Sequence, residues 1–113
     1  MVFTTSDLGG NALRVALTGR LDPAATAAIE TQMTAQVVGA GKPTAFDLTG
    51  LEFTGSLGIR LILSVARVLQ RRGLKVVVFG AHGVVAEVLS TVGLDAILPV
   101  LPDQAAAEAA LAA

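Results

Sequence analysis

The sequence has 113 residues, a length that suits one domain with an ordinary core. Hydrophobic residues make up 53% of it and charged residues only 15%, which excludes a disordered chain and predicts a fold filled by alanine, valine and leucine. The formal net charge is −1, and the basic residues do not gather beyond Arg71, Arg72 and the nearby Lys75, so nucleic-acid binding through a basic face is not expected.

Several kinds of site and location are excluded by what the sequence lacks. Cysteine is absent, and His82 is the single histidine, so we expect no disulfide, no metal site and no cofactor. The most apolar windows, 57–69 and 74–88, are interrupted by charged residues or glycines and fall short of the roughly 20 residues of a membrane span. The N-terminus lacks a signal-peptide pattern. We expect a soluble cytoplasmic protein without membrane insertion, whose leftover apolar surface is compatible with a weak homo-oligomer.

The first half of the chain predicts a hairpin, a helix and a buried strand. Residues 2–5 and 12–19 are typical of strands on either side of the turn at 9–11, and the second strand alternates apolar and polar positions. Asp22 followed by Pro23 indicates a helix start. The helix is expected over residues 24–38, and a short buried strand over residues 44–48. The predicted helical stripe consists of Ala25, Ile29, Met33 and Val37.

The second half predicts alternating helices and strands. Helices are expected at 57–71 and 84–92, with a third running from a cap at Asp103 to about residue 112, and strands at 74–79 and 97–100. On the first of these helices, the predicted apolar side consists of Leu57, Leu61, Val65 and Val68, widened by Ile62 and Leu69. The order β-β-α-β-α-β-α-β-α predicts one α/β domain over residues 1–113, with a mixed sheet whose central strands are parallel.

Ser56 stands out because it places a hydroxyl at the first turn of the predicted second helix. Backbone N–H groups are unpaired at a helix start, and the local field there is positive, so an anionic group can be held. Ser56 can therefore be a site that carries phosphate. The plainer interpretation of this stretch alone is an N-cap, a position that serine fills well. The residues of this stretch leave both interpretations open.

The carboxylates offer a neighbour for Ser56 but no catalytic pair. Asp22 follows a strand, and the loops after parallel strands gather at one edge of a sheet, so Asp22 and Ser56 are candidates to lie close together. Its alternative role is that of a helix cap before Pro23. Asp47 is expected to end a strand and Glu52 to be solvated, with no partner at catalytic spacing for either.

Enzyme chemistry finds little support in the sequence. A nucleophile elbow requires glycine two residues before the serine, but that position is Thr54. A serine hydrolase would also have to use His82 as its base, which leaves hydrolysis by Ser56 and His82 as a remote alternative. The loop 80–83 lacks the full dinucleotide fingerprint, and no glycine-rich loop is followed by a phosphate-binding lysine. We do not expect an enzyme.

Two segments together resemble STAS domains, the small domains of bacterial anti-sigma factor antagonists and of anion-transporter tails. Residues 17–22, with Gly19, Leu21 and Asp22, resemble the Gly-x-Leu-Asp segment of that family. Residues 46–59 resemble its second hallmark, in which an aspartate, a phosphorylatable serine or threonine, a second small residue and a glycine open the second helix. The later segments 73–78 and 84–97 follow the same layout, so the resemblance covers essentially the whole chain.

The resemblance implies an anti-sigma factor antagonist that binds an anti-sigma factor with serine-kinase activity and is released when the kinase phosphorylates it. Ser56 matches the phospho-acceptor, Asp22 the nearby carboxylate and Gly58 the motif glycine. Two positions depart from the pattern: Gly55 replaces the usual aspartate and Leu57 a common serine or threonine. Arg60, one turn later, is either a partner for a phosphate or a solvated residue. The departures favour a second hypothesis, a STAS subunit of a transporter or signalling complex that does not switch.

Overall fold

The computed structural model describes residues 3–112, which form a mixed α/β fold with four α-helices. We call its larger sheet the main sheet. In spatial order its strands are β1 (Phe3–Gly9), β2 (Ala12–Leu17), β4 (Thr44–Asp47), β6 (Val76–Phe79) and β7 (Val100–Leu101). β1 and β2 pair as an antiparallel hairpin, and the pairs β2–β4, β4–β6 and β6–β7 are parallel. The predicted mixed sheet with parallel central strands is confirmed. Val2, which the predicted first strand includes, lies outside the described residues.

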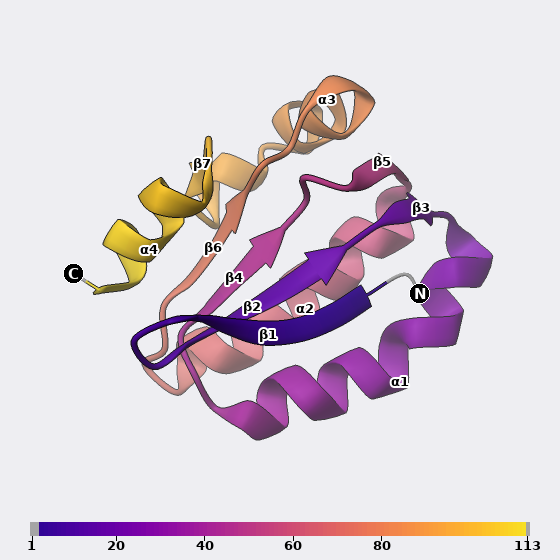
Figure 1. The fold of residues 1–113 in the computed structure, drawn as a ribbon. Coiled ribbons are helices and arrows are strands. Elements are labelled where there is room, and N and C mark those ends of the chain that lie inside the picture. Colours follow the sequence, from indigo (N-terminus) through magenta and orange to yellow (C-terminus); the bar gives the residue numbers. More distant parts are fainter. Residues whose placement is uncertain (1–2, 113) are drawn as a thin grey trace.

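Helices cover both faces of the main sheet (Figure 1). α1 (Pro23–Ala40) and α2 (Ser56–Arg71) lie side by side on one face, and α4 (Gln104–Ala112) packs against the other. Within residues 3–112, no helix combines the length and the apolar character that a bilayer crossing requires.

The alternation of side chains along β4 and β6 explains why both faces are covered. Phe46 and Val78 belong to the large apolar cluster under α1 and α2. Ala45 and Val77 point the other way, into a smaller cluster that includes Leu111 of α4. These strands are therefore buried on both sides, as the continuous run of β-branched residues at 76–78 predicts.

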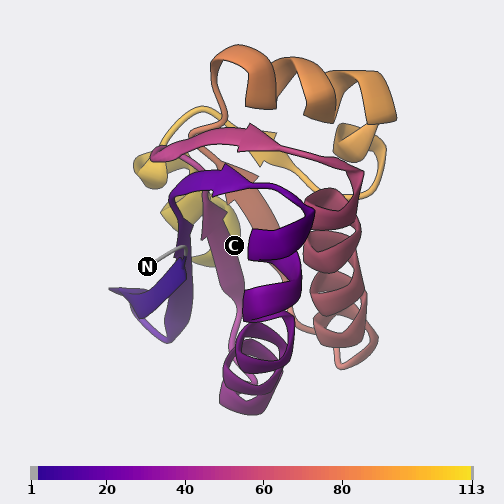
Figure 2. The ribbon, with the colours of Figure 1, turned by 90° about the vertical axis from the view of Figure 1, so that its right-hand side faces the viewer.

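A second, two-stranded sheet lies over the N-terminal ends of α1 and α2 (Figure 2). We call it the small sheet. It pairs β3 (Gly19–Leu21) with β5 (Leu51–Thr54) in parallel, and α3 (Gly83–Val92) packs on β5 from the outside. The sequence pattern did not predict it: residues 12–19 were expected to form one strand. Gly19 breaks that strand because its φ is +77°, a left-handed conformation that favours glycine.

The buried faces of the two long helices differ in detail from the predicted stripes. In α1 the buried positions include Ile29, Met33 and Val37 as predicted, but Thr26 rather than Ala25 completes the stripe. In α2 the predicted stripe is wrong at two positions, because Leu57 is 43% exposed and Val68 is only partly buried. The buried face of α2 consists of Gly58, Ile59, Leu61, Ile62, Val65, Ala66 and Leu69.

The predicted strand at 97–100 is wrong in most of its length. A 3₁₀ helix, η1 (Leu94–Ala96), follows α3, and the N–H groups of Ile97 and Leu98 both donate to the carbonyl of Leu94. This turn exposes Ile97 and buries Leu98. The strand β7 begins only after Pro99. Asp103 caps α4 as expected, because its Oδ1 accepts a hydrogen bond of 2.9 Å from the N–H of Ala106.

Candidate functional site

The small sheet brings the starts of α1 and α2 to one edge. Leu21 of β3 stands opposite Thr54 of β5 in the parallel register. One step further, the N–H of Gly55 donates a 3.2 Å hydrogen bond to the carbonyl of Leu21. Asp22 and Ser56 follow directly on the two strands. The structure therefore places them at a common edge, but this edge belongs to the small sheet and not to the main sheet.

Ser56 is the first residue of α2 and not its N-cap. The N-cap is Gly55, which has an extended backbone (φ −94°, ψ −178°), and no side chain caps this helix. The interpretation of Ser56 as an N-cap is therefore wrong, because the serine already lies inside the first turn. Its side chain is exposed, and its hydroxyl makes no hydrogen bond to any residue of the range 3–112. The hydroxyl is free to react or to bind.

Asp22 performs the capping role that its position before Pro23 predicts. Its Oδ1 accepts a 2.8 Å hydrogen bond from the N–H of Ala25, and its carbonyl oxygen accepts one from the hydroxyl of Thr26. The residue is half-buried at the start of α1. Asp22 thus supplies a negative charge at the edge that holds Ser56 while one of its oxygens stays bound to α1.

The two glycines around Ser56 have different structural roles. A Cβ on Gly58 would lie 2.6 Å from Cδ2 of Leu21 and would also collide with the hydroxyl of Thr54. Glycine at position 58 therefore lets the first turn of α2 rest directly on the small sheet. A Cβ on Gly55 would meet no heavy atom within 4 Å. Position 55 therefore has room for a side chain, and no packing contact requires glycine there.

Leu57 and Arg60, which follow Ser56 in the first turns of α2, line a groove between α1 and α2. The groove has a volume of about 290 Å³, and both residues line it together with Pro23 and Glu30 of α1. Leu57 is one of the exposed large apolar side chains of the described chain, and Arg60 is exposed as well. The edge that presents Ser56 therefore combines a free hydroxyl, an apolar side chain and a guanidinium group.

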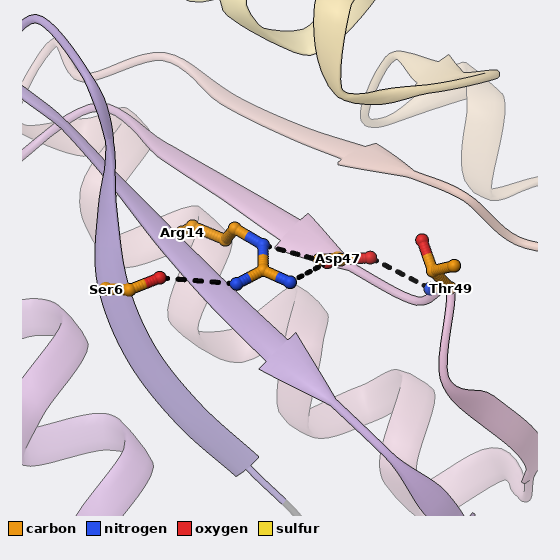
Figure 3. Close-up of polar contacts among 4 residues, drawn as sticks. All are labelled: Ser6, Arg14, Asp47 and Thr49. Carbon is orange, nitrogen blue, oxygen red and sulfur yellow. Dashed lines mark hydrogen bonds and ion pairs between the residues drawn. The ribbon is translucent and has the colours of Figure 1, made fainter.

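A partly buried ion pair holds the neighbouring strands together (Figure 3). Asp47 at the end of β4 accepts hydrogen bonds through Oδ2 from Nε and Nη2 of Arg14 in β2, at 2.8 and 2.5 Å. Its Oδ1 accepts a 2.9 Å bond from the N–H of Thr49, and Arg14 also donates to the hydroxyl of Ser6. Burial raises the pKa of Asp47, but the hydrogen bonds from Thr49 and the charge of Arg14 outweigh it and hold the pKa below its ordinary value. The pair is structural.

His82 is not placed to act on Ser56. It occupies the N-cap position of α3 without capping it, and its Nε2 lies 2.8 Å from the carbonyl oxygen of Thr49. Because a carbonyl only accepts, Nε2 donates this bond. No hydrogen bond joins His82 to Ser56, so the geometry supplies no base for the hydrolase alternative. Among the described residues, no cluster of three His, Asp or Glu side chains can hold a metal ion.

The sequence pattern does not predict one contact near this edge. The guanidinium of Arg20 in β3 lies over the ring of Phe53 in β5, at 4.6 Å from its centroid. The pair packs the two strands of the small sheet against each other by a cation–π contact. Only the pairing of β3 with β5 could have revealed it, and both strands are too short to show a clear period. Glu52, which precedes Phe53 in β5, is exposed as expected.

Comparison with known proteins identifies the family to which this fold belongs. A family model described as "Mlab, STAS domain" matches residues 4–101. The chain belongs to the STAS domain family. No curated protein sequence matches the chain significantly. The resemblance carried by the Gly-x-Leu-Asp segment and by the Ser56 motif is therefore confirmed at the level of the family.

Solved structures of STAS proteins share the whole fold at low sequence identity. A Thermotoga maritima protein assigned as an anti-sigma factor antagonist superposes with a TM-score of 0.87 at 15% identity, covering 98% of this chain and 95% of its own. An anti-sigma factor antagonist from Mycobacterium paratuberculosis gives 0.82 at 22% identity, with coverages of 98% and 93%. The phosphorylated form of the Bacillus cell fate determinant SpoIIAA gives 0.71 at 19% identity, with coverages of 96% and 98%.

Proposed function

We propose that the chain is an anti-sigma factor antagonist-like regulatory protein that binds an anti-sigma factor with serine-kinase activity and is controlled by phosphorylation of Ser56. The observation that carries the proposal is the exposed, unbonded hydroxyl of Ser56 at the first residue of α2. A kinase can reach this oxygen without breaking any hydrogen bond within residues 3–112. The similarity to SpoIIAA, which has been solved in a phosphorylated form, supports the same proposal.

The surroundings of Ser56 make phosphorylation an effective switch. A phosphoserine carries close to two negative charges at neutral pH. The first-turn N–H groups of α2 are not capped by a side chain, and Arg60 stands one helical turn later, so a phosphate here meets donors and a positive charge. Leu57, immediately after Ser56, is exposed and apolar. A partner surface that fits this leucine would have to desolvate the new charges, which is costly.

The direct test is phosphorylation of the purified chain by the cognate anti-sigma kinase with ATP, read by intact mass. We expect one added phosphate on the wild type and none on Ser56→Ala. Ser64, a second exposed serine on α2, provides the matched control, because Ser64→Ala should accept phosphate as the wild type does. A wild type that stays unmodified, or a Ser56→Ala variant that is still modified, would refute the switch.

A second candidate function keeps the family but not the switch. In it, the chain is a constitutive STAS subunit of a transporter or signalling complex. The exposed Leu57 and the bare Gly55 favour it, because an apolar residue suits a permanent interface and the missing aspartate removes a carboxylate from the motif. Co-purification with a transporter ATPase at constant stoichiometry, with no phosphate on Ser56, is the expected result. Recovery of an anti-sigma kinase alone would count against it.

A further inference from the structure

Three arginines form one exposed face along the last three turns of α2. Arg60, Arg67 and Arg71 are spaced at seven and four residues, which brings them within about 40° of one another around the helix axis. All three are exposed. Eleven residues of helix separate the first from the last, a distance of roughly 16 Å along the axis. We call these three residues the arginine face.

The arginine face forms no ion pair within residues 3–112. α2 contains no aspartate or glutamate. The ion pairs within residues 3–112 are Arg14–Asp47 and Lys42–Asp7, and neither involves this face. Arg72, the next basic residue, points elsewhere and donates to the carbonyl of Val38 in α1. Glu30 of α1 lines the groove between α1 and α2 together with Arg60 but forms no ion pair with it. Within residues 3–112, the three guanidinium groups are therefore not ion-paired with any carboxylate. Arg71 also lies in the last turn of α2, where a cation is favourable, whereas Arg60 and Arg67 lie before that turn.

A shallow groove runs along the arginine face, and two apolar side chains are part of its lining. Its volume is about 310 Å³, and the three arginines line it together with Leu63, Ser64 and Val68. Leu63 and Val68 are only partly buried, so apolar surface is accessible between the charges. A ligand that fits must therefore carry negative charges in a row and apolar groups beside them. An amphipathic acidic helix has this pattern, because its charged and apolar residues recur with the same period as those of α2.

We infer that the arginine face binds an acidic, amphipathic segment of a partner protein. Nucleic acid and anionic membranes fit less well. Polybasic membrane-binding clusters have about four to eight lysines and arginines, whereas the arginine face has three and the adjacent Arg72 is hydrogen-bonded to α1. The chain as a whole has a net charge of −1. Moreover, residues 76–113 contain four acidic residues and no lysine or arginine, so the field of the whole molecule repels an extended polyanion. A short acidic protein segment avoids this repulsion, because it would contact only α2.

This inference does not depend on phosphorylation of Ser56. The probe is a fluorescein-labelled amphipathic helical peptide whose glutamates repeat at the spacing of the three arginines and whose neighbouring face is leucine. Binding is measured by fluorescence anisotropy with the unphosphorylated chain at low and at physiological salt. We expect saturable binding that weakens as salt screens the charges, and no comparable binding of the same peptide with glutamine in place of glutamate.

Charge-removing variants distinguish binding at the arginine face from a general effect of the protein's charge. Arg67→Gln combined with Arg71→Gln should weaken binding about three- to tenfold, since each exposed ion pair contributes modestly. Arg67→Gln alone should weaken binding measurably, whereas Lys42→Gln, which also removes one positive charge but lies outside α2, should leave binding nearly unchanged. Because Arg67 and Arg71 are exposed, the double variant should fold, which circular dichroism checks.

Four results would overturn the inference. Equal binding by the double variant and the wild type would show that the arginine face is not the site. Equal binding of the glutamate and glutamine peptides would show that charge is not recognised. Binding to phosphatidylserine vesicles without binding to the peptide would assign the face to a membrane. Self-association in sedimentation that the double variant loses would identify a second copy of this chain as the occupant.

Discussion

Gly58 sets how closely the first turn of α2 approaches the small sheet. Its Cα faces Leu21 of β3 and Thr54 of β5, and both would be struck by a Cβ. The glycine has no unusual backbone angle, so its role is space and not conformational freedom. This contact fixes the height of Ser56 above the edge that also holds Asp22. A family motif glycine thus has a packing explanation in this chain.

We expect Gly58→Ala to destabilise the protein by about 1–3 kcal/mol, because an added methyl overpacks a filled site. Gly39→Ala is the matched control. Gly39 also lies in a helix, α1, but a Cβ there meets no atom within 4 Å, so alanine should stabilise by roughly 0.5–1 kcal/mol. Denaturant unfolding measures both. If both variants gain stability, the packing role of Gly58 is disproved.

Single residues show where inference from sequence stops. Asp22 could be predicted as a cap because Pro23 follows it, and the structure confirms the bond to Ala25. The exposure of Leu57 could not be predicted. Leu57 lies at the margin of the apolar side of α2, and the helical period alone does not say whether a residue at that margin is buried. The orientation of α2 about its own axis, relative to the main sheet, decides whether Leu57 is buried.

At the scale of elements, α2 begins without the side-chain cap that α1 and α4 have. Asp22 and Asp103 accept N–H bonds at the starts of those helices, whereas Gly55 offers no side chain. The empty position faces open space. α2 therefore lacks the stabilisation of a side-chain cap at the end that carries Ser56. Its first-turn N–H groups remain available to another acceptor.

Gly55→Asp should therefore stabilise the protein, by about 0.5–1 kcal/mol, because aspartate is a good N-cap and glycine is costly to order. Gly55→Ala separates the two effects: it removes the flexibility of glycine but adds no acceptor. We expect the aspartate variant to melt at a higher temperature than the alanine variant in differential scanning calorimetry. The opposite order would mean that a carboxylate at position 55 does not reach the first-turn N–H groups.

The small sheet is the element that sequence patterns could not predict. Its strands have three and four residues, and each lies next to a longer predicted element. Over so few residues, alternation of apolar and polar positions cannot be told from chance. The pairing of β3 with β5 is also non-local. The predicted closeness of Asp22 and Ser56 was nevertheless sound, since the parallel order of β3 and β5 produces the same edge effect as a larger sheet.

At the scale of the whole molecule, the Arg14–Asp47 pair links stability to pH. The pKa of Asp47 is lower in the folded chain than its ordinary value of 3.8. A depressed folded-state pKa means that the pair stabilises fully above the unfolded-state pKa, about 3.9, and loses this contribution as pH falls through the lower folded-state value. Acid should therefore weaken the main sheet between β2 and β4 below about pH 4.

We expect Asp47→Asn to cost about 1–3 kcal/mol at neutral pH, because Arg14 loses a buried charged partner. The difference from the wild type should shrink as the pH falls below about 4, where the wild type becomes protonated as well. Urea unfolding at a series of pH values measures this. Asp7→Asn, which changes a largely exposed carboxylate, is the control and should follow the wild type at every pH. A difference that stays constant with pH would contradict the assignment.

The positions of the charges have a consequence for how the protein meets a partner. The arginine face lies on α2, whereas Asp103 and Glu108 lie at α4, on the opposite face of the main sheet (Figure 1). A molecule with a net charge of only −1 therefore has an electric dipole across its sheet. In the field of an acidic partner, this dipole turns α2, and with it Ser56, toward the approaching surface before contact. Productive encounters then become more frequent without any increase in net charge, and added salt removes the advantage.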